Sequence, residues 1–213
     1  MTKPKNWPSN LPYLTTPSLD KDVKDQHLAA LRTRPSPNDT SIPSLPPSST
    51  ILPSSLVRIT PITNPSHPAH LQHGLFALRD LKPGTFILPY LGRTHTTTTT
   101  DPSSDYDLWL DRTADLAVDA AKSGNEARFV NDYRGGVREK PNAEFGVGWS
   151  EKWGMLCVGF WVVKGNAGMV GGKGKEKGRE KVKWEGIKKG EEICVSYGKG
   201  FWEKRAEEEA GDV

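Results

Sequence analysis

The stretch SGNEARFVNDYRG, residues 123–135, decides how this chain is interpreted. It places a Gly-Asn pair, an Arg-Phe step and an Asn-Asp pair between two segments of ordinary strand-like texture. A plain turn needs only one or two residues with special backbone or hydrogen-bonding properties. The density of glycine and polar residues therefore predicts a segment that has more than one structural task.

Composition limits the classes of protein that the chain can belong to. Its 213 residues suffice for one domain of about 130 to 150 residues plus tails. Hydrophobic residues make up 35% of the chain, which indicates that a sizeable part stays outside the core, although seven Trp residues show that a core exists. Lys and Arg number 29 against 26 Asp and Glu, and this excess is too slight to indicate nucleic-acid binding by charge alone.

The cysteine count and the lengths of the apolar runs limit the metal sites, the cellular compartment and the membrane association that the chain can have. Only Cys157 and Cys194 are present, so the chain can form neither a disulfide framework nor a four-thiolate zinc site, and no metal is expected. A reducing, intracellular compartment is the simpler interpretation. The N-terminal residues lack a signal-peptide pattern and no run of 18 apolar residues occurs, which predicts a soluble protein without a membrane partner.

The chain divides by texture into an arm, a domain and a tail. Residues 1–54 are rich in Pro, Ser, Thr and Asn, which predicts a mostly disordered, flexible arm with one short helix around residues 20–34 that Asp20 caps. Residues 55–202 form the domain, with loop insertions at about 94–105 and 165–183, and residues 203–213 are a charged tail.

Within the domain, short strand-like runs separated by turn signals predict a mainly β fold. LVRITPI, KPNAEFGVGW and GMLCVGFWVV are typical strands, and GLFALRDLKPGTFILPYLG is typical of a hairpin built on the Lys-Pro-Gly turn. No Gly-rich turn between a strand and a long helix occurs, which excludes a Rossmann-type cofactor site.

Four groups of residues follow one another in a recognisable order: HGLFALRDLKPGTFI, LPYLG, GNEARFVND with PNAEF, and IKKGEEICVSYG. In this order and spacing, residues 56–202 resemble the SET-domain protein lysine methyltransferases. The resemblance implies a fold of several short sheets in which the C-terminal segment threads under a preceding loop. Such threading is rare. It would bring the Asn131 and Tyr197 regions to either side of one cleft. Residues 123–135 would then form both the cofactor wall and the threaded crossing, which explains their many glycine and polar residues.

The resemblance also implies a reaction, the transfer of a methyl group from S-adenosylmethionine to a protein lysine, with a histone tail as the default substrate. The lysine must be a neutral amine held near ~3 Å from the methyl group, and a slot of low dielectric constant helps it to lose its proton. Tyr197 matches the family's catalytic tyrosine, and Tyr90 and Phe145 match positions that line the substrate channel. Val195, two residues before Tyr197 on the same strand face, is assigned to the channel as a small residue that leaves room for more than one methyl group. The structural alternative for each is ordinary packing in the core or in a sheet.

On the cofactor side, the resemblance implies a wall made by residues from two of the motifs and by an aromatic residue that follows the last motif. These residues are His73, Gly74, Leu75, Arg128, Asn131, Asp132 and Trp202. Phe201 stands beside the last of them as an aromatic that stacks on adenine or merely anchors the tail. For the glycine strand the structural alternative is a β-bulge. Asn142 is expected to fix the crossing by hydrogen bonds, and Glu191 and Glu192 to point to opposite faces of a turn.

Three departures from the family pattern leave other functions open. Gln72 replaces a glycine, Asp132 replaces a histidine, and the zinc-binding cysteines that follow the tyrosine in several relatives are missing. One alternative is therefore an inactive SET-like binding or scaffold module. Another is a basic protein that uses the Lys-Gly tract at 173–183 on nucleic acid, although that tract has no interleaved aromatics. The family's usual substrates predict a nuclear location, with the cytoplasm second.

Overall fold

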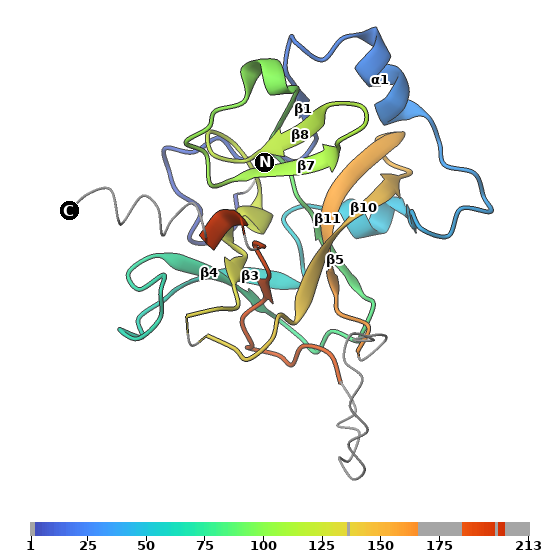
Figure 1. Cartoon of the computed structure of the whole chain (residues 1–213). Helices are drawn as coiled ribbons and strands as arrows, with labels where there is room; N and C mark the ends of the chain where they lie inside the picture. Colours follow the sequence, from blue (N-terminus) through green and yellow to red (C-terminus); the bar gives the residue numbers. More distant parts are fainter. Residues whose placement is uncertain (1–2, 136, 166–184, 199, 203–213) are drawn as a thin grey trace, which may run out of the picture.

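The computed structural model describes residues 3–135, 137–165, 185–198 and 200–202. Strands predominate in this part of the chain, which confirms the mainly β class (Figure 1). The elements, in chain order, are β1 Ser18–Leu19, α1 Asp25–Arg32, β2 Ser44–Leu45, η1 Pro47–Thr50, β3 Val57–Pro61, β4 His73–Ala77, β5 Phe86–Pro89, β6 Arg93–His95, η2 Thr97–Thr99, β7 Asp107–Asp111, β8 Leu116–Asp119, η3 Glu126–Phe129, β9 Asn131–Asp132, β10 Ala143–Ser150, β11 Met155–Val162 and β12 Cys194–Val195.

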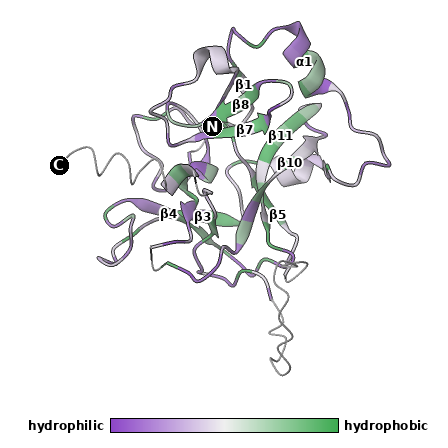
Figure 2. Cartoon of the chain, viewed as in Figure 1, coloured by the Kyte–Doolittle hydropathy of each residue, from purple (hydrophilic) through white to green (hydrophobic). Residues whose placement is uncertain are grey.

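The strands form several short sheets around one core. Their orders are β1-β6-β8-β7, β2-β10-β11-β5, β3-β4 and β12-β9. The longest pairing is the antiparallel β10–β11 hairpin, which runs from Ala143 opposite Val162 to Ser150 opposite Met155. Hydrophobic residues gather on β7, β8 and β11 (Figure 2), and most residues of β8 and β11 are buried. Among the described residues, no helix has the length and apolar character needed to cross a membrane.

The strands predicted at LVRITPI and on both sides of residue 150 are confirmed, but the hairpin predicted for residues 74–92 is wrong. β4 pairs with β3, whereas β5 pairs with β11. The turn between them leads away from β4 because the Gly84 N–H donates to the Val162 carbonyl at the end of β11. The Lys-Pro-Gly turn forms as its residues predict, but contacts with residues distant in sequence determine that β4 pairs with β3 and β5 with β11.

The N-terminal residues form part of the core instead of a flexible arm. β1 pairs in parallel with β6, and β2 pairs in parallel with β10. Trp7, Val23, Leu31 and Leu45 are buried against residues of the domain. These apolar side chains are too sparse to form a core of their own, and composition does not show that each one fills a gap in a core built by other residues.

Two smaller expectations also change. Helix α1 forms within residues 20–34, but Lys24 occupies its N-cap, and Asp20 instead forms an ion pair with Arg93. The insertion at 94–105 is not wholly a loop, since Thr94 and His95 are buried in β6. Apart from residue 165, the insertion at 165–183 and the tail at 203–213 lie outside the described residues.

The C-terminal segment runs between several earlier parts of the chain. Ile187 exchanges backbone hydrogen bonds with Leu81, and the Ile193 N–H donates to the Leu75 carbonyl over 2.8 Å. Further along, β12 pairs in parallel with β9 while Asn142 bonds to Cys194 from the other side. This is the threaded arrangement that the resemblance implies.

Candidate functional site

Two cavities meet at Tyr197. The larger has a volume of about 290 Å³ and the smaller about 190 Å³. Both are lined by the same partition of side chains, namely Asp105, Tyr106, Arg128, Tyr197 and Phe201. Because the tyrosine belongs to both walls, a group bound in one cavity and a group bound in the other would approach each other beside it.

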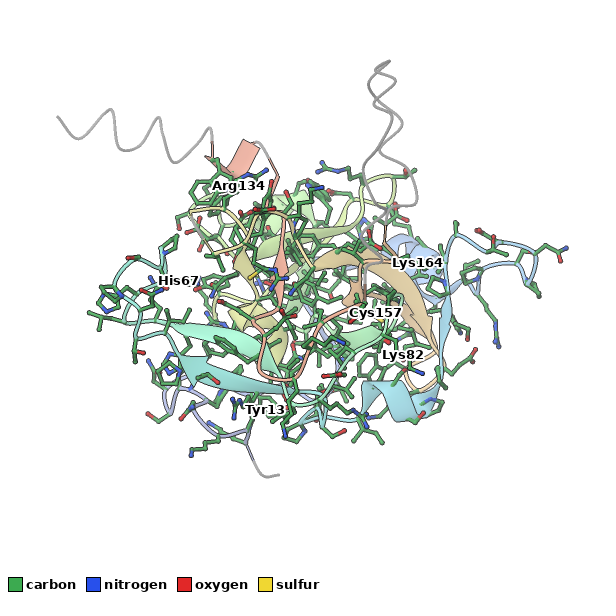
Figure 3. All side chains as sticks on the ribbon, turned by 90° about the horizontal axis from the view of Figure 1, so that it is seen from below. Tyr13, His67, Lys82, Arg134, Cys157 and Lys164 are labelled. Atoms are coloured by element: carbon green, nitrogen blue, oxygen red, sulfur yellow. The ribbon has the colours of Figure 1, made fainter. Side chains whose placement is uncertain are left out.

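The larger cavity lies between the ends of four chain segments. Residues of η3, β9 and the following turn form one side, the loop before β4 forms another, and the C-terminal aromatic residues close it. Besides the shared partition, its lining residues are His67, Pro68, Ala69, Gln72, His73, Phe129, Asn131, Asp132, Arg134, Val137 and Trp202. His67 and Arg134 emerge on the same side of the molecule (Figure 3).

The smaller cavity is largely aromatic. Besides the partition, Tyr90, Phe145 and Phe160 line it, together with Leu108, Val130 and other residues of β7 and η3. The Phe145 and Phe160 ring centroids lie 5.1 Å apart, and the Tyr90 hydroxyl is occupied by a 2.7 Å bond to the Tyr106 carbonyl. The aromatic rings of this slot can pack on an aliphatic chain, while Asp105, Asp107 and Arg128 add charged groups to its wall.

Tyr197 is held by hydrogen bonds from its hydroxyl and from its backbone N–H. Its hydroxyl donates to the Val130 carbonyl over 2.7 Å, and its backbone N–H donates to the Asp132 carboxylate over 2.6 Å. Burial raises the pKa of the Tyr197 phenol above its ordinary value, and the nearby Tyr106 and Asp132 add to the effect. The phenol is therefore protonated at neutral pH and stands as an oriented hydroxyl.

Asp132 uses its side chain, and not only its backbone, in this wall. One carboxylate oxygen accepts the Tyr197 N–H, while the other accepts the Arg134 backbone N–H over 2.8 Å. The Arg134 guanidinium also approaches the same carboxylate at 3.1 Å. The departure from histidine therefore ties β9 to the tyrosine by charge-assisted bonds.

Asn131 is held from behind by Glu192. Its amide donates to a Glu192 carboxylate oxygen over 2.8 Å and to the His73 carbonyl over 3.3 Å. A Cβ atom on Gly74 would lie 2.5 Å from the same carboxylate, so a side chain at this position would displace Glu192. The glycine is thus required by the Glu192 contact, which the sequence does not reveal.

The 3-10 turn η3 presents Arg128 and Phe129 to the cavities. Just before it, the buried Asn125 side chain bonds to the Leu91 N–H and the Pro89 carbonyl, which fixes the turn against β5. The Arg128 guanidinium then lies 4.3 Å from the Tyr106 ring centroid. Arg128 therefore packs against the partition as a cation over an aromatic face.

The structure does not gather all the residues that the sequence singles out. His73, Arg128, Asn131, Asp132 and Trp202 line the larger cavity, and Tyr90 and Phe145 line the smaller one, with Tyr197 between them. Gly74, Leu75 and Val195 are buried and lie on neither described wall. Leu75 points into the core from β4, and Val195 is covered where β12 pairs with Asp132 of β9.

Sequence reasoning missed Tyr106 and Asp105 of the partition and the loop before β4. Tyr106 opens the alternating segment that becomes β7, so its one signal was an aromatic residue at the junction of a polar loop and a strand. The loop residues His67, Pro68 and Ala69 stand in a Pro-rich run that is typical of any surface turn. Only the folded chain brings them to the cavity.

The larger cavity fits a molecule with separate polar ends, as S-adenosylmethionine has. Its volume is close to the lower end of the roughly 300 to 1,000 Å³ range for small-molecule sites. The indole N–H of Trp202, which lies on its wall, is buried and has no hydrogen-bond partner among the described residues. A buried donor without a partner is rare in proteins, and a bound acceptor would satisfy it.

Comparison with known families gives one match, to part of the chain. Residues 72–170 match the family model for the SET domain. A search of curated proteins gave no match.

Among solved structures, the chain is similar to KRYPTONITE in complex with mCHH DNA, an H3(1–15) peptide and SAH. The TM-score is 0.44 at 15% identity, over 67% of this chain and 24% of that one. It is also similar to polycomb repressive complex 2 of Chaetomium thermophilum, with a TM-score of 0.45 at 20% identity, over 67% of this chain and 15% of that one. The chain thus spans at most about a quarter of the length of these proteins. Residues 72–170 thus match the SET-domain model, and the motifs that carry the resemblance lie around one pair of cavities.

Proposed function

We propose that this chain is an S-adenosylmethionine-dependent protein lysine N-methyltransferase. The observation that carries the proposal is the position of Tyr197 between a polar cavity and an aromatic slot. Two substrates that enter from opposite sides would meet at one protonated hydroxyl. Tyr106 lines both cavities as well, but Tyr197 is the one that matches the catalytic tyrosine of the SET-domain motif.

The chain's own residues account for the remaining requirements of the reaction. A bound S-adenosylmethionine would supply an electrophilic methyl group: the lone pair of a neutral lysine amine attacks the methyl carbon, the C–S bond breaks, the thioether leaves, and the methylated ammonium product then releases a proton. Besides Asp105, Asp107 and Arg128, the slot has aromatic walls that can pack on the aliphatic part of an entering lysine. Tyr197 and the Val130 carbonyl orient its nitrogen, and Asn131 and Trp202 hold the polar ends of the donor in the larger cavity.

The target that we propose is a histone tail, and the proposed location is the nucleus, with the cytoplasm second. The basis is the usual substrate class of SET-domain methyltransferases together with the aromatic residues that line the slot. Neither a membrane nor a nucleic acid is part of the proposed interaction.

A scaffold without activity is the second candidate. It is favoured by Gln72, which stands on the wall of the larger cavity in place of a glycine, and by the Asp132 carboxylate, which Arg134 engages. Both changes act on the donor cavity. They leave Tyr197 and the aromatic slot intact, so the two candidates differ in whether the donor binds and reacts.

The test joins donor binding with methyl transfer. Calorimetry of the full chain with S-adenosylmethionine is expected to show binding, and radiolabelled donor is expected to label histones. Tyr197→Phe is expected to keep the donor dissociation constant within about twofold and to lower the transfer rate by roughly a hundredfold or more, as loss of an oriented catalytic group does. Tyr133→Phe, in the turn after β9, is the matched control and is expected to retain activity.

The outcomes separate the candidates. An absence of donor binding by the unaltered chain would support the scaffold. Donor binding without labelling of histones, but with labelling of proteins in a cell extract, would support the enzymatic function with a substrate other than a histone. A transfer rate in Tyr197→Phe equal to that of Tyr133→Phe would remove the role assigned to the Tyr197 hydroxyl.

A further inference from the structure

The loop that precedes β4 is built as a closed unit against the larger cavity. We name residues 62–72 the His67 loop. Its ends are joined by two backbone hydrogen bonds, from the Ile62 N–H to the Gln72 carbonyl over 2.9 Å and from the Leu71 N–H to the Ile62 carbonyl over 3.0 Å. Four of its residues lie on the cavity wall: His67, Pro68, Ala69 and Gln72. The loop is therefore a wall of the cavity and not a distant surface feature.

His67 connects this loop to the C-terminal segment. Its Nδ1 accepts the Ala69 N–H over 3.0 Å, so the ring proton is on Nε2, which lies 3.0 Å from a Glu192 carboxylate oxygen. The side chains are only 9% and 10% exposed. A buried carboxylate requires donors, and His67 supplies one of them.

The Glu192 carboxylate links His67 to Asn131. Its second oxygen accepts one N–H of the Asn131 amide over 2.8 Å, and the other N–H of that amide goes to the His73 carbonyl. Because both N–H groups are used, the amide can offer the cavity only its carbonyl oxygen, an acceptor. An acceptor suits the ammonium group of an amino-acid end.

The His67 loop also packs against the turn that follows β9, on the opposite wall of the cavity. A Cβ atom on Gly135 would lie 2.2 Å from Pro68, so the loop packs directly on the turn that carries Arg134. Leu71, at the end of the loop, has a positive φ of 67° although it is not a glycine. A backbone conformation of this kind persists only where surrounding contacts hold it.

We infer that His67 is a positioning residue for donor binding: through Glu192 it fixes the Asn131 amide with its acceptor toward the cavity. This inference rests on the proposed function, since it assigns the larger cavity to the donor. It adds a residue of this chain's own loop, outside the motifs that define the family resemblance, to the machinery of the site.

Two substitutions at one position separate the contact from the local turn. In His67→Asn, the short amide can still accept the Ala69 N–H but does not reach Glu192. In His67→Gln, the amide nitrogen stands about where Nε2 stands and can donate to Glu192. His70→Asn, in the same loop but not on the cavity wall, is the matched control. Each full-length variant is titrated with S-adenosylmethionine by calorimetry, and the Michaelis constants for donor and for peptide are measured separately.

The dissociation constant for the donor is expected to rise roughly tenfold in His67→Asn, as for a lost charge-assisted hydrogen bond, and to stay within about twofold in His67→Gln and His70→Asn. The donor Michaelis constant should rise in His67→Asn while the peptide Michaelis constant does not, whereas partial unfolding would lower the turnover number alone. Equal donor affinity in the two His67 variants would overturn the inference and leave the proposed function standing. Failure of the unaltered chain to bind the donor would overturn both.

Discussion

Asn142 is the residue that fastens the C-terminal segment at its crossing. It is completely buried, its amide N–H donates to the Glu192 carbonyl over 2.8 Å, and its amide oxygen accepts the Cys194 N–H over 2.8 Å. No water can replace these partners in a packed interior without rearrangement. The side chain therefore acts as a short piece of sheet between two backbone segments that are distant in sequence.

Substitution of Asn142 by Ala is expected to lower the free energy of unfolding by about 2 to 6 kcal/mol. The reason is that one buried N–H and one buried carbonyl lose their partners, at about 1 to 3 kcal/mol each. Urea denaturation measures the change, and the exposed Asn38→Ala is the control, with an expected change within about 0.5 kcal/mol. Equal midpoints for the two variants would contradict the role of the side chain at the crossing.

At the scale of elements, the N-terminal segment supports the site from outside. Trp7 is 8% exposed, and its ring centroid lies 5.7 Å from that of Phe129, which lines the larger cavity. Nearby, Tyr13 donates to the buried Glu126 carboxylate over 2.9 Å, and Glu126 opens η3. The 3-10 turn is thus held between β5 on one side and residues 7–13 on the other.

Trp7→Ala is expected to lower the free energy of unfolding by about 3 kcal/mol or more, as large-to-small changes of a buried aromatic residue do. Trp109→Ala is the matched control, since Trp109 is 40% exposed. Its expected loss is below about 1 kcal/mol, mostly from its cation–π contact with Arg112. Chemical denaturation compares the two variants. Equal, small losses would show that the first residues do not pack as described.

At the scale of the whole molecule, several ionisable groups are buried in the neutral form. Burial raises the pKa of the Cys157 thiol from an ordinary value of 9.0 to about 12. Burial also raises the pKa values of Cys194, Tyr90 and Tyr197 above their ordinary values. In the unfolded chain these groups ionise at their ordinary values, so folding prevents an ionisation that the unfolded state gains above about pH 9.

The sign of the pH dependence follows directly. Below pH 9 the Cys157 thiol is neutral in both states, and the stability of the fold is unaffected by its ionisation. Between pH 9 and about 12 only the unfolded thiol loses its proton, so the free energy of unfolding falls by about 1.4 kcal/mol per pH unit from this group. The other buried groups act in the same direction.

Urea unfolding at pH 8, 9, 10 and 11 tests this expectation with Cys157→Ala. The variant is less stable at pH 8 because a buried side chain is truncated. The difference in the free energy of unfolding between the unaltered chain and the variant should become smaller above pH 9, because only the unaltered chain has a thiol that ionises on unfolding. The comparison below pH 9 serves as the control, since the difference should be constant there. A difference that stays constant up to pH 11 would show that the thiol is accessible to solvent in the folded state.

The sequence by itself determined the mainly β class and, through the motifs around Asn131 and Tyr197, the resemblance to the SET domain, which implies that those two residues meet at one cleft. Glycine, asparagine and aromatic residues at fixed spacing carry that information because few other residues satisfy such tight local geometry. The tertiary structure alone decided that Trp7 belongs to the core, that Val195 lies away from the channel, and that His67 reaches Glu192. The physical reason is that these contacts join residues far apart in the chain, and their energies depend on which surfaces meet after folding, which a local pattern of residues does not encode.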